Sequence, residues 1–158
     1  MIYIDTREKP HAIEGIVDYF NRHGIPHEKC KLDTGDYMLA GNPLLVIDRK
    51  RNLSELCQNL SGGTDGKGDV RRFMNEVRLA HERGVKLIIL CEHGGEIRQL
   101  SDVAKWKNPR LERYPFAITG RDLMERMYRV HIQYGVEFLF CCKRSTGKKI
   151  AELLGAVH

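Results

Sequence analysis

The stretch GDYMLAGNPLLVIDRK at residues 35–50 decides the fold, because two short apolar runs in it flank a turn signal. Gly41-Asn42-Pro43 has the chemistry of a tight turn, so the chain is predicted to fold back there as an antiparallel hairpin. Counting outward from Asn42 places Asp36 directly opposite Asp48, where facing Cβ atoms lie about 4.5–5.5 Å apart. The hairpin is therefore expected to hold two carboxylates side by side.

Facing carboxylates repel each other, and a shared divalent cation would remove that repulsion. Lys50 lies two residues beyond Asp48 and emerges on the same face of the strand. Carboxylates prefer Mg²⁺ or Mn²⁺, and such an ion polarises a phosphoryl oxygen and lowers the pKa of bound water. A neighbouring lysine can orient or help to deprotonate that water, so these groups suit hydrolysis of a phosphodiester bond. The alternative interpretation is a solvated edge hairpin with ordinary surface charges.

The composition is that of a globular chain with a basic excess. The chain has 158 residues, of which 42% are hydrophobic and 30% charged, and its formal net charge is +5. This length fits one domain, which is expected to span residues 1–158. The positive charge favours a polyanionic partner, with nucleic acid as the first candidate. No apolar run approaches the roughly 18 residues needed to span a membrane, so no membrane partner is expected.

The five cysteines argue against a disulfide framework and against a zinc site, because their number is odd and no C-x-x-C pair occurs. Cys91, Cys141 and Cys142 lie in apolar runs. Reduced, mostly buried thiols are therefore expected. Together with the absence of a signal peptide pattern at the N-terminus, this favours a cytoplasmic location, including the cytoplasm of a phage-infected cell.

Helices and strands are predicted to alternate along the chain. Strands are expected at residues 1–4, 28–32, 37–40, 44–48, 86–91 and 136–141. Helices are expected at residues 10–23, 52–60, 70–83, 97–102, 119–134 and 145–154, with a flexible loop at 61–69. The order predicts an α/β fold in which helices flank both faces of a central mixed β-sheet. The sheet is mixed because the early hairpin is antiparallel.

Three motifs, in this order, resemble the nuclease domain of the XPF/Mus81/Hef structure-specific endonuclease family: Asp5-Thr-Arg-Glu8, Gly35-Asp36-Tyr37 and Asp48-Arg49-Lys50. That family carries D-x-R-E, G-D-[YF] and E-R-K-x-x-x-D elements. The similarity continues through the predicted helices and the late strand, so it covers nearly the whole chain. It implies a restriction-endonuclease-like nuclease fold with a PD-(D/E)xK core.

The chain departs from the family pattern at two positions. The signature glutamate of the family is Asp48 here, which is still able to bind a metal, and the final aspartate of the signature falls at Ser54, beside Glu55. The family also carries a helix-hairpin-helix module, which has no counterpart in this sequence. The resemblance therefore implies a stand-alone nuclease of prokaryotic or phage type.

The resemblance assigns roles to the motif residues. Four are expected to be catalytic: Glu8, Asp36, Asp48 and Lys50. The three carboxylates among them are expected to bind Mg²⁺ or Mn²⁺, and Lys50 to orient or activate water.

Other motif residues are expected to support the site. Asp5 and Arg7 would do so through hydrogen bonds and an ion pair. Strand alternation sends Arg49 to the face opposite Lys50, where a structural ion pair with a carboxylate such as Asp5 is expected. Tyr37 alternates away from Asp36 and is expected to pack within the hairpin.

Two basic segments outside the motifs are candidates for DNA contact. One flanks a glycine-rich loop and contains Lys67, Arg71 and Arg72. The other interleaves the only tryptophan with Lys105, Lys107 and Arg110, a pattern that suits phosphate contact and base stacking. Each segment has a structural alternative, namely a solvated linker for the first and a tryptophan that packs a loop onto the core for the second.

The favoured function is a metal-dependent endonuclease that cuts branched, flap or fork DNA in repair or recombination. Family nuclease domains pair, so a homodimer through the late helix and strand is a further expectation. Two alternatives stay open. One is a catalytically weak or inactive DNA-binding relative, which the departures at Ser54 and Asp48 suggest. The other is a resolvase or restriction-like nuclease that shares only the core.

Overall fold

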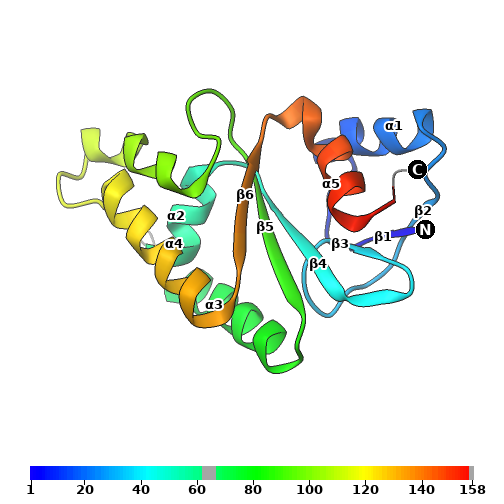
Figure 1. The fold of residues 1–158 in the computed structure, drawn as a ribbon. Coiled ribbons are helices and arrows are strands. Elements are labelled where there is room, and N and C mark those ends of the chain that lie inside the picture. The colour runs from blue at the N-terminus through cyan, green and yellow to red at the C-terminus, as the bar shows by residue number, and fades with distance from the viewer. Residues whose placement is uncertain (62–66, 157–158) are drawn as a thin grey trace.

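A mixed six-stranded sheet forms the centre of the molecule in the computed structural model, which describes residues 1–61 and 67–156 (Figure 1). The strands are β1 (Ile2–Ile4), β2 (His27–Lys29), β3 (Tyr37–Leu39), β4 (Asn42–Lys50), β5 (Lys86–Glu92) and β6 (Glu137–Cys141). Their spatial order is β2-β1-β3-β4-β5-β6. β3 runs antiparallel to both of its neighbours, and the other pairs are parallel. The predicted mixed sheet is confirmed.

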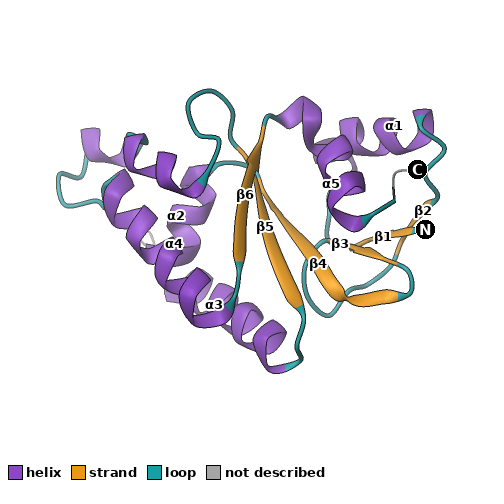
Figure 2. Ribbon diagram, viewed as in Figure 1, coloured by secondary structure: helices purple, strands orange, loops and turns teal. Residues whose placement is uncertain are grey.

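Helices cover both faces of this sheet, as predicted (Figure 2). On one face, α2 (Leu53–Ser61), α3 (Lys67–Glu82) and α4 (Gly120–Tyr134) pack on a core that includes Val46. On the other face, α1 (Glu14–Arg22) and α5 (Thr146–Leu154) enclose a second core that includes Ile47. Because successive residues of a strand point to opposite faces, the two neighbours of β4 belong to different cores.

The segment between β5 and α4 contains short 3-10 helices. They are η2 (Leu100–Lys105) and η3 (Pro109–Glu112), so the predicted helix at 97–102 lies three residues further along. α4 begins as predicted, because the Thr119 hydroxyl accepts a hydrogen bond from the Asp122 N–H at 3.2 Å. The Asp122 carboxylate in turn accepts the Thr119 N–H at 3.3 Å, which completes a capping box.

The other element boundaries differ modestly from the predicted ones. The predicted first helix is divided into η1 (Pro10–Ala12) and α1, and another short 3-10 helix, η4 (Lys143–Ser145), precedes α5. β2 ends at residue 29 rather than 32, because its partner β1 supplies only three residues to the ladder. α3 begins three residues earlier than predicted. Of the predicted loop at 61–69, residues 62–66 lie outside the described part of the chain.

The hairpin of β3 and β4 has the predicted register at its open end and a different turn. Tyr37 pairs with Ile47, whereas Leu39 pairs with Asn42, so the ladder shifts by three residues before the turn. The turn residues are therefore 40 and 41, and Gly41 has a φ of +87°, a conformation that glycine adopts without strain. The predicted turn at 41–43 is wrong, because residues 42 and 43 lie in β4 ahead of a bulge, where a proline can be tolerated.

Two other expectations concern thiols and membranes. All five cysteines are free, but only Cys57 and Cys91 are buried, and the other three are half-buried. The expectation of mostly buried thiols was therefore only partly right.

Among the described residues, no helix combines the length and the apolar character that crossing a membrane requires.

Candidate active site

The three signature residues form the end of β4, the strand that links the antiparallel half of the sheet to its parallel half. Asp48, Arg49 and Lys50 are all buried, with 5%, 9% and 8% of their surface exposed. Lys50 lies over the Phe73 ring of α3, 5.3 Å from its centroid. Alternation therefore places Asp48 and Lys50 on the α2–α3 face and sends Arg49 toward the α1–α5 face.

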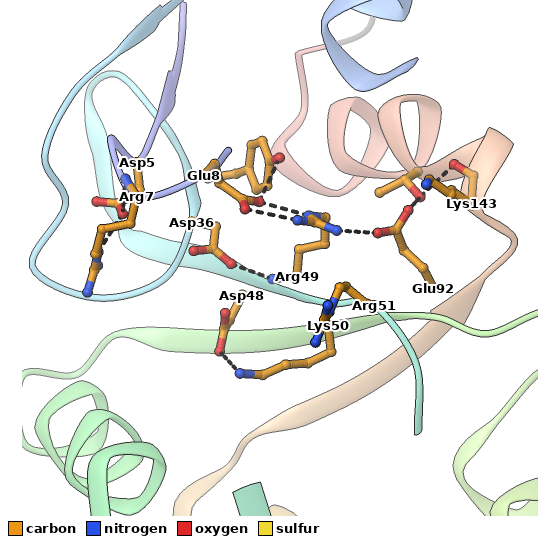
Figure 3. A network of polar contacts seen from close by, with 12 residues as sticks. Asp5, Arg7, Glu8, Asp36, Asp48, Arg49, Lys50, Arg51, Glu92 and Lys143 are labelled. Atoms are coloured by element: carbon orange, nitrogen blue, oxygen red, sulfur yellow. Dashed lines mark hydrogen bonds and ion pairs between the residues drawn. The ribbon is translucent and has the colours of Figure 1, made fainter. Parts of the chain in front are cut away.

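Asp36 lies opposite Asp48, as the sequence predicted (Figure 3). The Asp36 N–H donates to the Ile47 carbonyl at 2.7 Å, and the Asp36 carboxylate accepts the Arg49 N–H at 2.8 Å. Gly35 makes this approach possible. Its φ is +73°, and a Cβ at this position would lie 3.1 Å from the Ile47 carbonyl oxygen.

The pair of carboxylates is electrostatically strained. Burial, followed by the charge of Asp48, raises the pKa of Asp36 well above its ordinary value, and the charge of Glu8 adds to the shift. The hydrogen bond from the Arg49 N–H opposes this shift but does not cancel it. Asp48 Oδ2 is buried and has no hydrogen-bond partner among the described residues, although Lys50 Nζ forms an ion pair with it at 3.2 Å.

These features fit a divalent cation held by Asp36 and Asp48. A cation between the two carboxylates would offset their repulsion and bind the oxygen that lacks a hydrogen-bond partner. Among residues 1–61 and 67–156, no group of three or more His, Cys, Asp or Glu side chains is arranged to hold a metal ion. Water or a phosphate oxygen would therefore complete the ligand set, as is usual for Mg²⁺.

Lys50 carries its proton at neutral pH in this environment. Burial by itself would lower its pKa, but the charges of Asp48, Glu55 and Glu76 outweigh that effect, and the pKa of Lys50 is raised. A buried ammonium group beside the carboxylates can donate hydrogen bonds and offset negative charge on a phosphate. In this state Lys50 acts as a donor rather than as a base.

Arg49 holds two glutamates together on the opposite face (Figure 3). Its Nε and Nη2 donate to the two Glu8 oxygens at 2.8 and 2.9 Å, and Nη1 donates to Glu92 at 2.5 Å. The Tyr37 hydroxyl donates to Glu8 at 3.0 Å, and the Thr146 hydroxyl donates to Glu92 at 2.7 Å. The network thus joins the loop after β1 to β3, β4, β5 and α5.

These contacts correct one predicted pairing. Arg49 does not bind Asp5, whose carboxylate instead accepts the Arg7 Nε–H at 2.6 Å and the Leu32 N–H at 2.8 Å. Asp5 and Arg7 therefore make the predicted hydrogen bonds and ion pair, and they stabilise the loops around the site. Arg49 engages both oxygens of Glu8, and the role of Glu8 as a cation ligand stays a prediction.

Glu76 of α3 is a site residue that the motifs did not indicate. Its Oε1 accepts the Gly35 N–H at 2.9 Å and the Thr34 hydroxyl at 3.3 Å, so it fastens the loop before Asp36 to α3. Burial, followed by the charge of Asp48, raises the pKa of Glu76. In the sequence, the feature that could have indicated Glu76 is an acidic residue beside the apolar face of a helix, which is an unusual place for a charge.

An open pocket of about 430 Å³ lies where Glu76 and Lys50 meet the solvent. Arg7 and Arg72 also line it, so the pocket combines a half-buried carboxylate and a buried ammonium group with exposed guanidinium groups. Glu92 is the second site residue that the motifs did not indicate. The sequence feature that could have indicated it is an acidic residue at the end of an apolar central strand.

The predicted DNA-contact residues differ in their surroundings. The side chain of Lys67 lies outside the description. Arg72 pairs with Asp69, and Lys105 pairs with Asp102. Arg71 and Lys107 are exposed and form no ion pair among the described residues, and Arg110 lies over the Tyr114 ring. Of this set, the structure brings Arg72 to the pocket that Lys50 lines.

The structure also describes the surroundings of Ser54, the second departure from the family pattern, and of the tryptophan. Ser54 is exposed, and the neighbouring Glu55 pairs with Arg51 at 2.9 Å. Trp106 is half-buried and packs against the core of the α2–α4 face, which is the structural alternative given for it.

Comparisons with known proteins agree with this fold. A family model, the ERCC4 domain, matches residues 4–153. The solved structure of XPF from Aeropyrum pernix is similar with a TM-score of 0.65 and 20% sequence identity, over 97% of this chain and 62% of that chain. This chain thus spans less than two thirds of the length of that one, and at this identity the likeness concerns the fold. No curated protein matches at a significant level.

Proposed function

The chain belongs to the ERCC4 domain family of nucleases, and from this premise we propose that it is a divalent-cation-dependent endonuclease. Its proposed substrate is DNA with a branch, flap or fork, and its reaction is hydrolysis of a phosphodiester bond, in repair or recombination. One observation carries the proposal. The carboxylate of Asp36 faces that of the buried Asp48, with the Lys50 ammonium 3.2 Å from Asp48.

Each residue has a proposed part in the reaction. Asp36 and Asp48 would hold Mg²⁺ or Mn²⁺, which when bound polarises a phosphoryl oxygen and lowers the pKa of water. Lys50 would donate to a phosphate oxygen and offset the charge that develops on it. Arg49, through Glu8 and Glu92, would keep the end of β4 in place. The exposed basic residues would contact phosphates along the DNA backbone.

The direct test is cleavage of labelled flap, fork, four-way and linear DNA with Mg²⁺ or Mn²⁺. The protein should cut at least one branched substrate faster than the linear duplex. Asp36→Asn and Asp48→Asn should abolish cleavage, and Lys50→Ala should slow it by about 100-fold or more.

Asp33→Asn is the matched control, because that carboxylate lies in the pocket-lining loop and its side chain is 85% exposed. It should cut at the wild-type rate. Folded wild-type protein that cuts none of the four substrates with either ion would rule out the proposed activity.

A catalytically inactive, DNA-binding relative is the second candidate. The position of Ser54 and the lack of a three-carboxylate group among the described residues favour it. Asp36, Asp48 and Lys50 together speak against it, because the two carboxylates interact directly and the Lys50 ammonium lies 3.2 Å from Asp48. DNA binding that needs no cation, with no turnover, would identify this candidate. A preference for linear over branched DNA would instead favour a restriction-like nuclease that shares only the core.

Pairing of two copies is a further part of the proposal. Tyr128 and Ile132 lie one helical turn apart on α4 and are 37% and 79% exposed. An apolar stripe of this kind could contact a second copy. Light scattering at several protein concentrations should show a dimer that Ile132→Glu dissociates, and a wild-type monomer at all of these concentrations would contradict it.

A further inference from the structure

Phe116 is fully exposed, in the segment of residues 105–116 that leads from η2 through η3 toward α4. No other large hydrophobic residue among the described ones is exposed to that extent, and the next is Ile132 at 79%. A phenylalanine ring gains about 1.5–3 kcal/mol when it leaves water, so a ring held fully in solvent is available for contact with a partner.

The segment that carries Phe116 is firmly anchored. Asn108 is 4% exposed, its Nδ2 donates to the Ile118 carbonyl at 2.9 Å, and its Oδ1 accepts the Arg110 N–H at 3.1 Å. The Ala117 N–H donates to the Tyr114 carbonyl at 2.9 Å and closes the turn around Phe116. The ring is thus presented on a pre-organised turn, and little further ordering is needed when it binds a partner.

The surroundings of the ring are strongly basic. Residues 105–116 contain four basic residues and one acidic residue, a net charge of +3 within a chain whose net charge is +5. All four basic residues are exposed, and three of them, Lys107, Arg110 and Arg113, form no ion pair among residues 1–61 and 67–156, although Arg110 lies over the Tyr114 ring. Such a surface complements a polyanion with accessible flat rings, which is the chemistry of a nucleic acid.

The 105–116 segment packs on α2, the helix that follows the end of β4. Asn108 Nδ2 is 3.8 Å from Cys57 Sγ of α2, and α2 begins three residues after Lys50. Cys57 is four residues into that helix, or roughly 6 Å along its axis. Figure 1 shows the yellow-green segment beside α2 and the start of α4. One DNA molecule can therefore contact both the segment and the end of β4.

Within an intact duplex each base is stacked on its neighbours, and exposing a base costs a few kcal/mol. An exposed ring on a basic surface finds a base to stack on only where this stacking is already interrupted. We propose that Phe116 stacks on the base left open at a branch or flap, while the basic residues of the 105–116 segment contact the adjoining phosphates. This inference rests on the proposed function and assigns the recognition of branched substrates to one side chain.

The test measures binding rather than cleavage. The probes are a flap and a linear duplex of equal length, each with 2-aminopurine at the branch base or at the equivalent position. They are titrated into wild-type protein without divalent cations. Wild type should bind the flap more tightly and quench its fluorescence by stacking. Phe116→Ala should weaken flap binding by roughly 5- to 100-fold and lose the quenching, with linear-duplex affinity within about twofold of wild type.

Two variants sharpen the comparison. Phe116→Trp should restore flap affinity and quenching, because a larger ring stacks at least as well. Leu44→Ala is the matched control, since Leu44 is also exposed, at 56%, and lies on β4 outside the segment. It should bind both probes as wild type does. Unchanged melting temperatures would show that the substitutions leave the fold intact.

The outcomes separate this inference from the proposed activity. Equal flap binding by wild type and Phe116→Ala overturns the inference, even if wild type cleaves DNA. An equal loss of flap and linear binding overturns it as well, because the ring would then not discriminate branches. Wild type that binds the flap through Phe116 but never cleaves overturns the proposed activity and leaves the inference standing. Wild type that binds neither probe overturns the inference, and the cleavage assay with Mg²⁺ or Mn²⁺ then decides the proposed activity on its own.

Discussion

Arg49 binds Glu8 through two parallel contacts of 2.8 and 2.9 Å, and only 7% and 10% of the two side chains are exposed. The third guanidinium nitrogen reaches Glu92, so one arginine joins residues 41 and 43 positions away in the chain. Removing one partner of such a buried pair leaves the other charge uncompensated. This relationship therefore connects the stability of the fold to the position of the neighbouring aspartates.

Arg49→Ala should lower the free energy of unfolding by about 3–5 kcal/mol, because it leaves Glu8 and Glu92 buried without their cation. Arg49→Lys should restore little, since a point charge cannot make the forked contacts. Urea denaturation measures both effects. Arg51→Ala is the control, because that arginine is 73% exposed and its pair with Glu55 should contribute no more than about 1 kcal/mol. A similar cost for the alanine variants at 49 and 51 would contradict the structural role.

Asp36→Asn should stabilise the cation-free protein at neutral pH while it abolishes cleavage. The folded state raises the pKa of Asp36, so between the unfolded and folded pKa values the folded state binds more protons. The stability that the Asp36 carboxyl contributes is therefore lost as the pH rises from its unfolded pKa through its folded pKa. Asparagine keeps an acceptor for the Arg49 N–H and has no charge to bury. A gain of about 0.5–2 kcal/mol is expected.

The gain should disappear below the ordinary aspartate pKa of about 3.9, where Asp36 is protonated in both states. Urea titrations at neutral and acidic pH, in the presence of a chelator, measure the difference. A variant that is less stable than wild type at neutral pH would show that the repulsion between the carboxylates is not the dominant effect.

Mg²⁺ or Mn²⁺ should raise the melting temperature of the wild-type protein. A ligand that binds only the folded state stabilises it by about 2.7 kcal/mol at a concentration of 100 times its Kd. Asp36→Asn and Asp48→Asn should lose this response, whereas Asp33→Asn should keep it. Chelation should abolish both the shift and the cleavage. An equal shift in all four proteins would place the ion elsewhere.

Glu76→Ala should slow cleavage and lower stability by about 0.5–1.5 kcal/mol, because the Gly35 N–H loses its acceptor. Glu76→Gln keeps a side-chain oxygen at that place, so it should retain most of the stability. If the role of Glu76 is to position Asp36, Glu76→Gln should also restore kcat, and KM should change little in either variant. Glu82→Ala, at the exposed end of α3, is the control. If Glu76→Gln instead keeps the full stability but loses kcat, the negative charge of the Glu76 carboxylate is what contributes to cleavage.

Local spacing in the sequence was enough to predict much of the site. Alternation along β4 put Asp48 and Lys50 on one face and Arg49 on the other, and the hairpin register put Asp36 opposite Asp48. The capping box at Thr119 fixed the start of α4. Such features depend on neighbours in the chain or across a single turn, so the order of residue types specifies them. The hairpin turn was an exception. It lies at residues 40 and 41 rather than at the predicted 41–43, because the extra residues of the bulge in β4 do not pair with β3.

The tertiary structure alone decided which partner each charged side chain meets. Arg49 could have paired with several acids, and packing of the loop after β1 and of β5 brought Glu8 and Glu92 to it rather than Asp5. Glu76 entered the site because α3 crosses the sheet beside Gly35, 41 residues away. The sequence by itself determined the faces on which the charges lie, since strand geometry is local. Their partners depend on how distant elements pack together, and no local spacing encodes that.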